Sequence, residues 1–164
     1  MSTQGNNALT KGIPTLEVAF VVILKTDWNA ELVDKLVFGC EKVLTENKIT
    51  FCTETVPGAV ELPFAVKAWD RSAQRKPDAY IVLGIVIRGG TPHFDYVCKI
   101  VSEGVLALNM TLEVPVVFGV LTVENEQQVL DRAGGKDGHK GAEAAVSAIK
   151  MIHYNRKVAG SRLH

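Results

Sequence analysis

The sequence carries no excess of charge and no hydrophobic run long enough to cross a membrane. Its 164 residues include 18 lysine and arginine residues and 18 aspartate and glutamate residues, which gives no net charge. No overall field therefore attracts nucleic acid or an anionic membrane. The longest apolar run, Val18 to Leu24, is far too short to span a bilayer, and the residues before it lack a signal-peptide core. We expect a cytoplasmic protein that binds neither nucleic acid nor membranes and holds any anion in a local site.

Cysteine is also scarce. Cys40, Cys52 and Cys98 are odd in number, widely spaced and without a CxxC pair. This pattern argues against a disulfide framework and offers no spacing typical of metal ligands. We expect reduced, mostly buried thiols and no metal site.

Apolar residues, in contrast, make up 47% of the chain and recur with alternating strand and helix periods. Continuous β-branched runs are typical of strands covered on both faces. Strands are predicted at 18–24, 49–56, 79–87 and 114–121, and helices at 32–44, 60–73, 92–108, 125–132 and 141–154. This alternation predicts one α/β domain over residues 1–164, a three-layer α/β/α sandwich with a central four-stranded parallel sheet of flavodoxin-like type and helices on both faces. The polar ends, 1–14 and 155–164, are predicted to be mobile tails.

Four connections leave the carboxyl ends of these strands, where ligands bind in open parallel sheets. They are 25–29, 56–61, 87–93 and 122–126. In chain order they carry an aromatic residue, a glutamate, a Gly-Gly-Thr turn with a histidine, and an acidic loop. We therefore expect these side chains to gather at one edge of the sheet, which is the first indication of a functional site.

The turn at 88–93 has two interpretations. Gly89 and Gly90 permit a tight turn and Thr91 suits an N-cap, so the N–H groups at the helix start could bind a phosphate. A plain strand-to-helix turn uses the same residues and is favoured when this stretch is taken alone. His93 lies in the first helical turn, where the helix dipole disfavours an imidazolium by roughly 0.3–1 kcal/mol. A neutral imidazole can act as a general base, but a lone histidine is more often structural.

Other residues near this edge also admit two interpretations. Trp28, flanked by polar residues such as Asn29, is either a core aromatic or a partly exposed ring that stacks on a flat heterocycle. Glu61 either complements a helix dipole or accepts hydrogen bonds from ligand hydroxyls. Arg132 and Lys140 are either surface charges or anchors for a small phosphorylated substrate.

Together these segments resemble the lumazine synthase family, whose members make 6,7-dimethyl-8-ribityllumazine for riboflavin biosynthesis. The matching pieces, in family order and spacing, are VPGAVELPFA at 56–65, LGIVIRGGTPHFDYV at 83–97, PVVFGVLTVENEQQVLDRAG at 115–134 and GHKGAEAAVSAI at 138–149. The resemblance covers about residues 15–155. It implies a transferase without cofactor or metal that condenses 5-amino-6-ribitylaminouracil with 3,4-dihydroxy-2-butanone 4-phosphate and releases phosphate and water.

The resemblance also implies roles for individual residues. His93 transfers protons, Trp28 stacks on the pyrimidine beside Asn29, and Glu61 holds ribityl hydroxyls. Backbone contacts come from Ala59, Val60, Val86 and Ile87, the phosphate is held by Gly90, Thr91 and Arg132, and a neighbouring subunit supplies Phe118, Arg132 and Lys140. The implied partners are the two substrates, inorganic phosphate and further copies of the chain, in a homo-oligomer whose sites lie between adjacent subunits of a pentamer.

Two positions depart from the usual family pattern. Trp28 stands where most members carry phenylalanine, and some members that bind riboflavin tightly carry tryptophan, so we expect this chain to bind riboflavin or a related flavin. Ile85 stands where many members place threonine, which removes one hydroxyl near the site.

Several alternatives stay open. A flavodoxin-like electron carrier would need a Ser/Thr/Gly-rich loop after the first strand and a phospho-receiver would need clustered aspartates, and 25–29 has neither. A shell or storage protein that has lost catalysis differs only in activity. Family members form pentamers, decamers or icosahedral shells, and the short connection at 134–141 resembles that of the shell formers. Arg88 is assigned no role beyond a structural or intersubunit ion pair.

Overall fold

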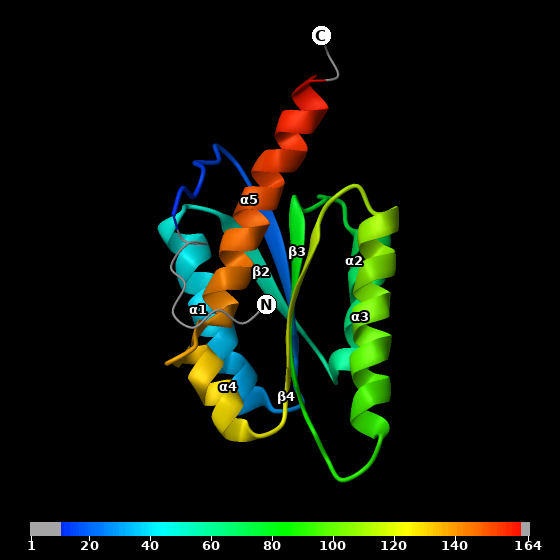
Figure 1. Ribbon diagram of the computed structural model, residues 1–164. Coiled ribbons are helices and arrows are strands. Elements are labelled where there is room, and N and C mark those ends of the chain that lie inside the picture. The colour runs from blue at the N-terminus through cyan, green and yellow to red at the C-terminus, as the bar shows by residue number, and fades with distance from the viewer. Residues whose placement is uncertain (1–10, 162–164) are drawn as a thin grey trace.

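The computed structural model describes residues 11–161, which form a parallel sheet covered by helices on both faces (Figure 1). The strands of the sheet are β1 (Phe20–Thr26), β2 (Thr50–Val56), β3 (Ala79–Ile87) and β4 (Val116–Val123). The helices are α1 (Ala30–Glu46), α2 (Leu62–Ser72), α3 (His93–Thr111), α4 (Glu126–Arg132) and α5 (Lys140–Ser161), with a 3-10 turn η1 (Ala59–Glu61) before α2 and two short strands, β5 (Ala133–Gly135) and β6 (Gly138–His139), before α5. The predicted flavodoxin-like α/β/α sandwich is confirmed. No helix in this part of the chain is long and apolar enough to cross a membrane.

Two hydrophobic cores, one on each face of the sheet, hold the layers together. Alternate residues of β1 point to opposite faces. Val21 and Ile23 pack with α1, α4 and α5, whereas Val22 and Leu24 pack with α2 and α3. All four side chains are buried. This burial on both faces is the reason why the strand has a continuous apolar sequence rather than an alternating one.

The order of the strands in the sheet, β2-β1-β3-β4, creates a crevice at one end. The chain leaves β1 through α1 on one face to reach β2, and returns through α2 on the other face to reach β3. Figure 1 shows α1, α4 and α5 on one side of the sheet and α2 and α3 on the other. The connections after β1 and β3 therefore leave to opposite faces although these strands are neighbours, which opens a crevice between them.

Helices α1 and α5 meet in a tight seam that has room only for glycine at two positions. A Cβ on Gly141 would lie 1.9 Å from the Leu36 carbonyl oxygen, and a Cβ on Gly39 would lie 2.0 Å from the His139 ring. His139 is half-buried there, and its Nδ1 accepts a hydrogen bond from the Ala142 N–H at 3.4 Å. Burial lowers the pKa of His139.

Two strands are shifted as a whole from their predicted positions, and most other elements differ from their predicted bounds by one or two residues at an end. β1 begins and ends two residues later than predicted, because Lys25 and Thr26 continue the pairing with β2 and Thr26 is buried despite its hydroxyl. β4 is shifted by the same two residues. The prediction that Thr91 caps α3 is wrong. The helix begins at His93 with Pro92 at the N-cap, so Thr91 lies one position too early to cap it.

The last helix is longer than predicted. α5 does not end near Tyr154 but continues to Ser161. Arg156, in the added part, donates a hydrogen bond to the Val18 carbonyl and lies 2.7 Å from Asp78. These polar contacts attach a segment whose hydrophilic sequence is typical of a tail. The predicted mobile tail at 155–164 is therefore wrong up to residue 161. The rest of that prediction, at 162–164 and 1–10, lies outside the described residues.

Candidate active site

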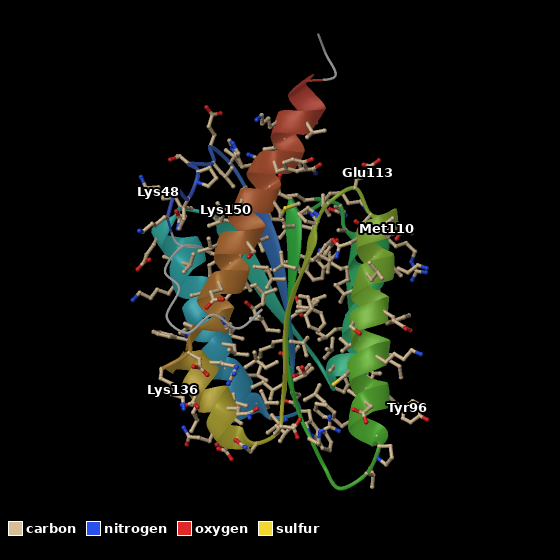
Figure 2. All side chains as sticks on the ribbon, viewed as in Figure 1. Lys48, Tyr96, Met110, Glu113, Lys136 and Lys150 are labelled. Atoms are coloured by element: carbon tan, nitrogen blue, oxygen red, sulfur yellow. The ribbon has the colours of Figure 1, made fainter. Side chains whose placement is uncertain are left out.

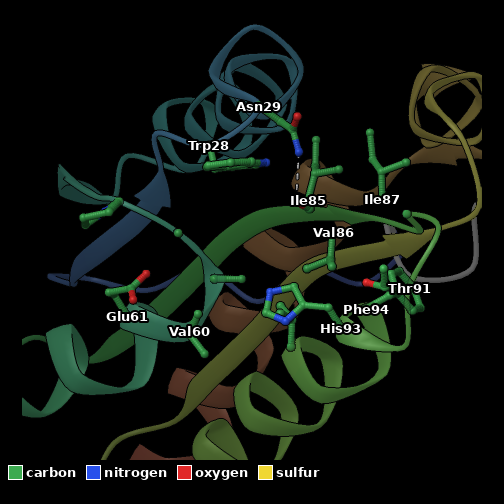
Figure 3. Close-up of a pocket in the computed structure, with 15 residues that line it drawn as sticks. Trp28, Asn29, Val60, Glu61, Ile85, Val86, Ile87, Thr91, His93 and Phe94 are labelled. Carbon is green, nitrogen blue, oxygen red and sulfur yellow. Dashed lines mark hydrogen bonds between the residues drawn. The ribbon is translucent and has the colours of Figure 1, made fainter.

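A cavity of about 430 Å³ opens at the carboxyl ends of β1, β2 and β3, next to the start of α3 (Figure 3). A cavity of this size suits a small-molecule ligand. Most of the predicted site residues line it, namely Trp28, Asn29, Ala59, Val60, Glu61, Val86, Ile87, Thr91 and His93. The lining is completed by Pro57, Gly58, Ile85, Gly89, Phe94 and Val97. Three of the four predicted loops, at 25–29, 56–61 and 87–93, therefore meet at one edge of the sheet within a single chain.

Trp28 presents an open aromatic ring to one side of the cavity. The residue is 75% exposed, and its backbone N–H donates to the Pro57 carbonyl at 3.0 Å, which joins the loop after β1 to the loop after β2. Asn29 adopts a left-handed backbone with a φ of 63°, and its side-chain amide donates to the Ile85 carbonyl at 3.2 Å, the dashed line in Figure 3. A ring held at a cavity in this way can stack on a flat ligand.

Glu61 offers a carboxylate with no partner among residues 11–161. The residue ends η1 directly before α2 and is exposed, and its side chain makes no hydrogen bond or ion pair in that range. A Cβ on Gly58 would lie 3.1 Å from Glu61 Oε2, so glycine at this position leaves room for the carboxylate. The carboxylate can therefore accept hydrogen bonds from the hydroxyls of a ligand.

His93 and the turn before it supply polar groups on the α3 side of the cavity. His93 is the first residue of α3, and Figure 3 shows that its imidazole and the Trp28 indole lie at separate places around the cavity. Its side chain has no hydrogen-bond partner within residues 11–161. In the same range, the N–H groups of Gly89, Gly90 and Thr91 donate to no acceptor. Open N–H groups at the start of a long helix are suited to bind an anion.

Arg88 makes several contacts at the base of this turn. Its Nε lies 2.9 Å from Glu124 Oε2, and its Nη2 lies 3.2 Å from Asp95 Oδ1. The guanidinium carbon lies 4.1 Å from the centre of the Phe94 ring. Asp95 thus pairs with Arg88 and not with His93.

Some predicted residues do not line this cavity. Gly90 lies in the turn but outside the lining, and Phe118 and Lys140 line a second, separate hollow between β4 and α5. Arg132 ends α4 and lies 3.2 Å from Asp137. No lysine or arginine belongs to the lining that the described residues form. Residues 11–161 of a single chain therefore bring no cationic side chain to the cavity.

The cavity also contains residues that the sequence analysis missed. Val97 follows His93 by four residues, a spacing that places both on one helix face and was a usable signal. Phe94 carries no such signal, since its position next to His93 predicts a different direction. Its ring is placed by the stack with Arg88.

Neither a metal centre nor a reactive thiol is indicated. No group of histidine, cysteine, aspartate and glutamate side chains in the described part of the chain could hold a metal ion. The three cysteines are free thiols. Cys40 is buried, which raises the pKa of its thiol to about 12. Cys52 and Cys98 are only half-buried, so the prediction of burial is confirmed for Cys40 alone.

Comparison with known proteins identifies similar sequences over almost the whole chain. A family model described as 6,7-dimethyl-8-ribityllumazine synthase matches residues 19–156. A protein of that name from Kineococcus radiotolerans is 44% identical over 155 residues, which cover 90% of this chain and 94% of the relative. Another from Parabacteroides distasonis is 42% identical over 147 residues, covering 87% and 90%. A third, from Bacteroides fragilis, is 42% identical over 135 residues, covering 80% and 93%.

Proposed function

This chain belongs to the 6,7-dimethyl-8-ribityllumazine synthase family, and from that premise we propose how its cavity is used. The family catalyses the condensation of 5-amino-6-ribitylaminouracil with 3,4-dihydroxy-2-butanone 4-phosphate in riboflavin biosynthesis, and this chain is an enzyme of that kind. Family membership implies small-molecule substrates and a homo-oligomer. The observation that carries the proposal is one cavity that joins an open indole, an unpaired carboxylate, an unpaired imidazole and a helix start.

The ribitylaminopyrimidine binds between the loops after β1, β2 and β3. Its flat ring stacks on Trp28, beside Asn29. The backbone at Val86 and Ile87 contacts the ring edge, while Glu61 accepts hydrogen bonds from the ribityl hydroxyls with backbone help from Ala59 and Val60. Support comes from the exposure of the Trp28 ring and from the unpaired state of Glu61.

The phosphorylated butanone binds at the turn before α3. Its phosphate accepts hydrogen bonds from the open N–H groups of Gly90 and Thr91, which lie at the positive end of the α3 dipole. Because the lining lacks a cation, Arg132 and Lys140 of a neighbouring subunit complete the phosphate site, with Phe118 beside them. Sites of this kind lie between adjacent subunits of a pentamer. The short connection at 134–141 favours further assembly into an icosahedral shell.

His93 moves protons in the reaction. The amine of the pyrimidine forms an imine with the ketone and water leaves. Phosphate then leaves as a C–H proton is removed, and ring closure expels a second water. The imidazole of His93, next to the phosphate site, is placed to take up that proton. Much of the rate enhancement arises because both substrates are held side by side.

Trp28 gives the same site an affinity for riboflavin or a related flavin, whose flat ring system stacks on an indole. Titration of the purified protein with riboflavin is expected to quench the Trp28 fluorescence. The control is Trp28→Phe, in which only the other tryptophan, Trp69, contributes to the fluorescence. The absence of quenching at tens of micromolar riboflavin would contradict this part of the proposal. We place the enzyme in the cytoplasm, where free thiols such as Cys40, Cys52 and Cys98 stay reduced.

Activity and assembly are tested in two measurements. Purified protein with both substrates is expected to produce lumazine and inorganic phosphate in equal molar amounts, with the lumazine measured by its absorbance. Light scattering gives the mass of the assembly and distinguishes a pentamer, a decamer and a shell of twelve pentamers. A protein that assembles but forms no lumazine would favour the shell or storage role over catalysis.

A further inference from the structure

The turn that presents His93 and the open N–H groups is not held in shape by its own residues. Gly89 and Gly90 have no neighbour within 4 Å of an added Cβ, and neither has a positive φ. Thr91 makes no capping bond, and no side chain caps α3. A turn with so few internal restraints needs an anchor outside it to keep one conformation.

Arg88 provides such an anchor at the point where the turn leaves β3. Its backbone N–H donates to the Val123 carbonyl at 2.8 Å, which fixes the base of the turn to the end of β4. Its guanidinium then reaches Glu124 after β4 and Asp95 in the first turn of α3, and it covers the ring of Phe94. One side chain thus joins three segments of the chain around the turn.

The guanidinium is suited to this arrangement for chemical reasons. It is planar, and it donates in a fixed fork, so it can serve two carboxylates in its plane and an aromatic ring on its face at once. Lysine carries one compact charge and cannot stack in the same way. Phe94 lines the cavity and directly follows His93, and Asp95 is the next residue in the first turn of α3. A shift of this helix start would therefore also shift His93.

We infer that Arg88 is a positioning residue, which holds the turn at 88–95 in the conformation that binds the phosphorylated substrate and aims His93. Arg88 does not line the cavity, so it acts through Phe94, Asp95 and the turn. This inference rests on the proposed function, because it assigns the phosphate to this turn. It predicts an effect on one substrate and not on the other, since Trp28 and Glu61 belong to loops that Arg88 does not touch.

The chain offers a matched control for a purely structural role. Arg156 also pairs with an aspartate, Asp78, and its side chain is 40% exposed, against 38% for Arg88. It lies at the amino ends of β1 and β3, because Asp78 directly precedes β3 and bonds to Phe20, the first residue of β1. Loss of Arg156 removes a comparable ion pair at the end of the sheet opposite the cavity.

The test compares Arg88→Gln, Arg88→Lys and Arg156→Gln by steady-state kinetics with both substrates. Arg88→Gln is expected to raise KM for the phosphorylated butanone about tenfold, in keeping with two exposed ion pairs and one cation–π contact together. It should lower kcat several-fold and change KM for the pyrimidine less than twofold. Arg88→Lys should recover part of the loss, and Arg156→Gln should match the wild type in all three constants.

A second measurement separates this inference from the proposed function. Binding of inorganic phosphate alone, followed by calorimetry, is expected to weaken about tenfold in Arg88→Gln and to stay unchanged in Arg156→Gln. Equal changes in both KM values, or Arg88→Gln kinetics like those of Arg156→Gln, would overturn the role of Arg88. If the wild type turned over no substrate, the proposed function would fail, and phosphate binding by the two variants would decide the role of Arg88 by itself.

Discussion

Two pairs of glycines in this chain occupy opposite surroundings. Gly39 and Gly141 lie in the α1–α5 seam, where an added Cβ would meet another group at 2.0 and 1.9 Å. Gly89 and Gly90 lie in the turn before α3, where an added Cβ would meet nothing within 4 Å. Figure 2 shows the side chains packed between the sheet and α5, while the outer side of α3, at Tyr96 and Met110, faces away from the sheet.

The difference separates the demands of folding from those of binding. The chain itself explains the seam glycines, because any larger side chain would push α1 and α5 apart. Nothing among residues 11–161 explains the turn glycines, which have neither a positive φ nor a close neighbour there. We attribute glycine at these two positions to a ligand, because a substrate phosphate can approach the backbone closely where no side chain is present.

Gly141→Ala is the change with the largest expected effect. Its Cβ would overlap the Leu36 backbone carbonyl, which has no flexible end to move aside. We expect the variant to lose about 3 kcal/mol of stability, measured as a lower Tm at matched protein concentration. Gly160→Ala is the control on the same helix, because nothing lies within 4 Å of its added Cβ. It should be neutral or stabilising by up to about 1 kcal/mol, and equal losses in both variants would contradict the packing argument.

His93→Ala tests the other region without touching the core. We expect kcat to fall roughly 10- to 100-fold, because a proton-transfer group is lost while both substrates still bind side by side. The Tm should stay within a degree or two of the wild type, since the His93 side chain is exposed and has no partner among the described residues. His153→Ala, an exposed histidine on α5, is the control for kcat. An unchanged kcat in His93→Ala would remove this residue from the mechanism.

Gly90→Ala sharpens the comparison between the two glycine pairs. The substitution should leave the Tm unchanged, since the added Cβ meets open space. It should raise KM for the phosphorylated butanone about three- to tenfold, the loss expected for one impaired hydrogen bond. Thermal unfolding and steady-state kinetics on one preparation give both values. A fall in Tm comparable to that of Gly141→Ala would show that the turn glycine serves folding after all.

The smallest expected effect is a pH dependence of stability that arises from His139, next to the α1–α5 seam. Burial lowers the pKa of His139, and this effect outweighs the backbone hydrogen bond of the ring and the charge of Glu143, which raise the pKa. The charge of Lys42 adds a smaller lowering. A histidine whose pKa is lower in the folded state stabilises the fold above its unfolded pKa, near 6.5, and loses that contribution as the pH falls through the folded pKa. The Tm difference between wild type and His139→Gln should therefore shrink as the pH is lowered from 8 to 5. A constant difference would contradict this assignment.

The sequence predicted best where burial leaves no ambiguity. β3 has its predicted bounds because it is an apolar run with no polar interruption. β1 was displaced because Lys25 and Thr26 look like loop residues, although Thr26 is buried. The extra turns of α5 depend on Arg156 and its distant partner Asp78, a contact that local patterns do not encode.

The same reasoning applies to the site. The loops at 25–29, 56–61, 87–93 and 122–126 were predicted to meet because strand direction alone brings them to one edge. The first three line the cavity, whereas the fourth does not and instead contacts Arg88 through Glu124. An ion pair was the one role assigned to Arg88, but its partners were not predicted, since Glu124 lies 36 residues away along the chain. The roles assigned to Phe118, Arg132 and Lys140 depend on how a second copy of the chain packs against the first. The hydrophobic periodicity of one chain does not predict that packing.

The connections after β1 and β3 leave to opposite faces of the sheet, and this affects how such an enzyme can evolve. One wall of the cavity, with Trp28 and Glu61, is carried by loops tied to each other by the Trp28–Pro57 hydrogen bond. The other wall, with His93, is tied to β4 through Arg88. Mutations can therefore accumulate in one wall while the other is preserved. If the two walls bind the ligands proposed for them, affinity for a flavin and affinity for a small phosphorylated ketone would change independently.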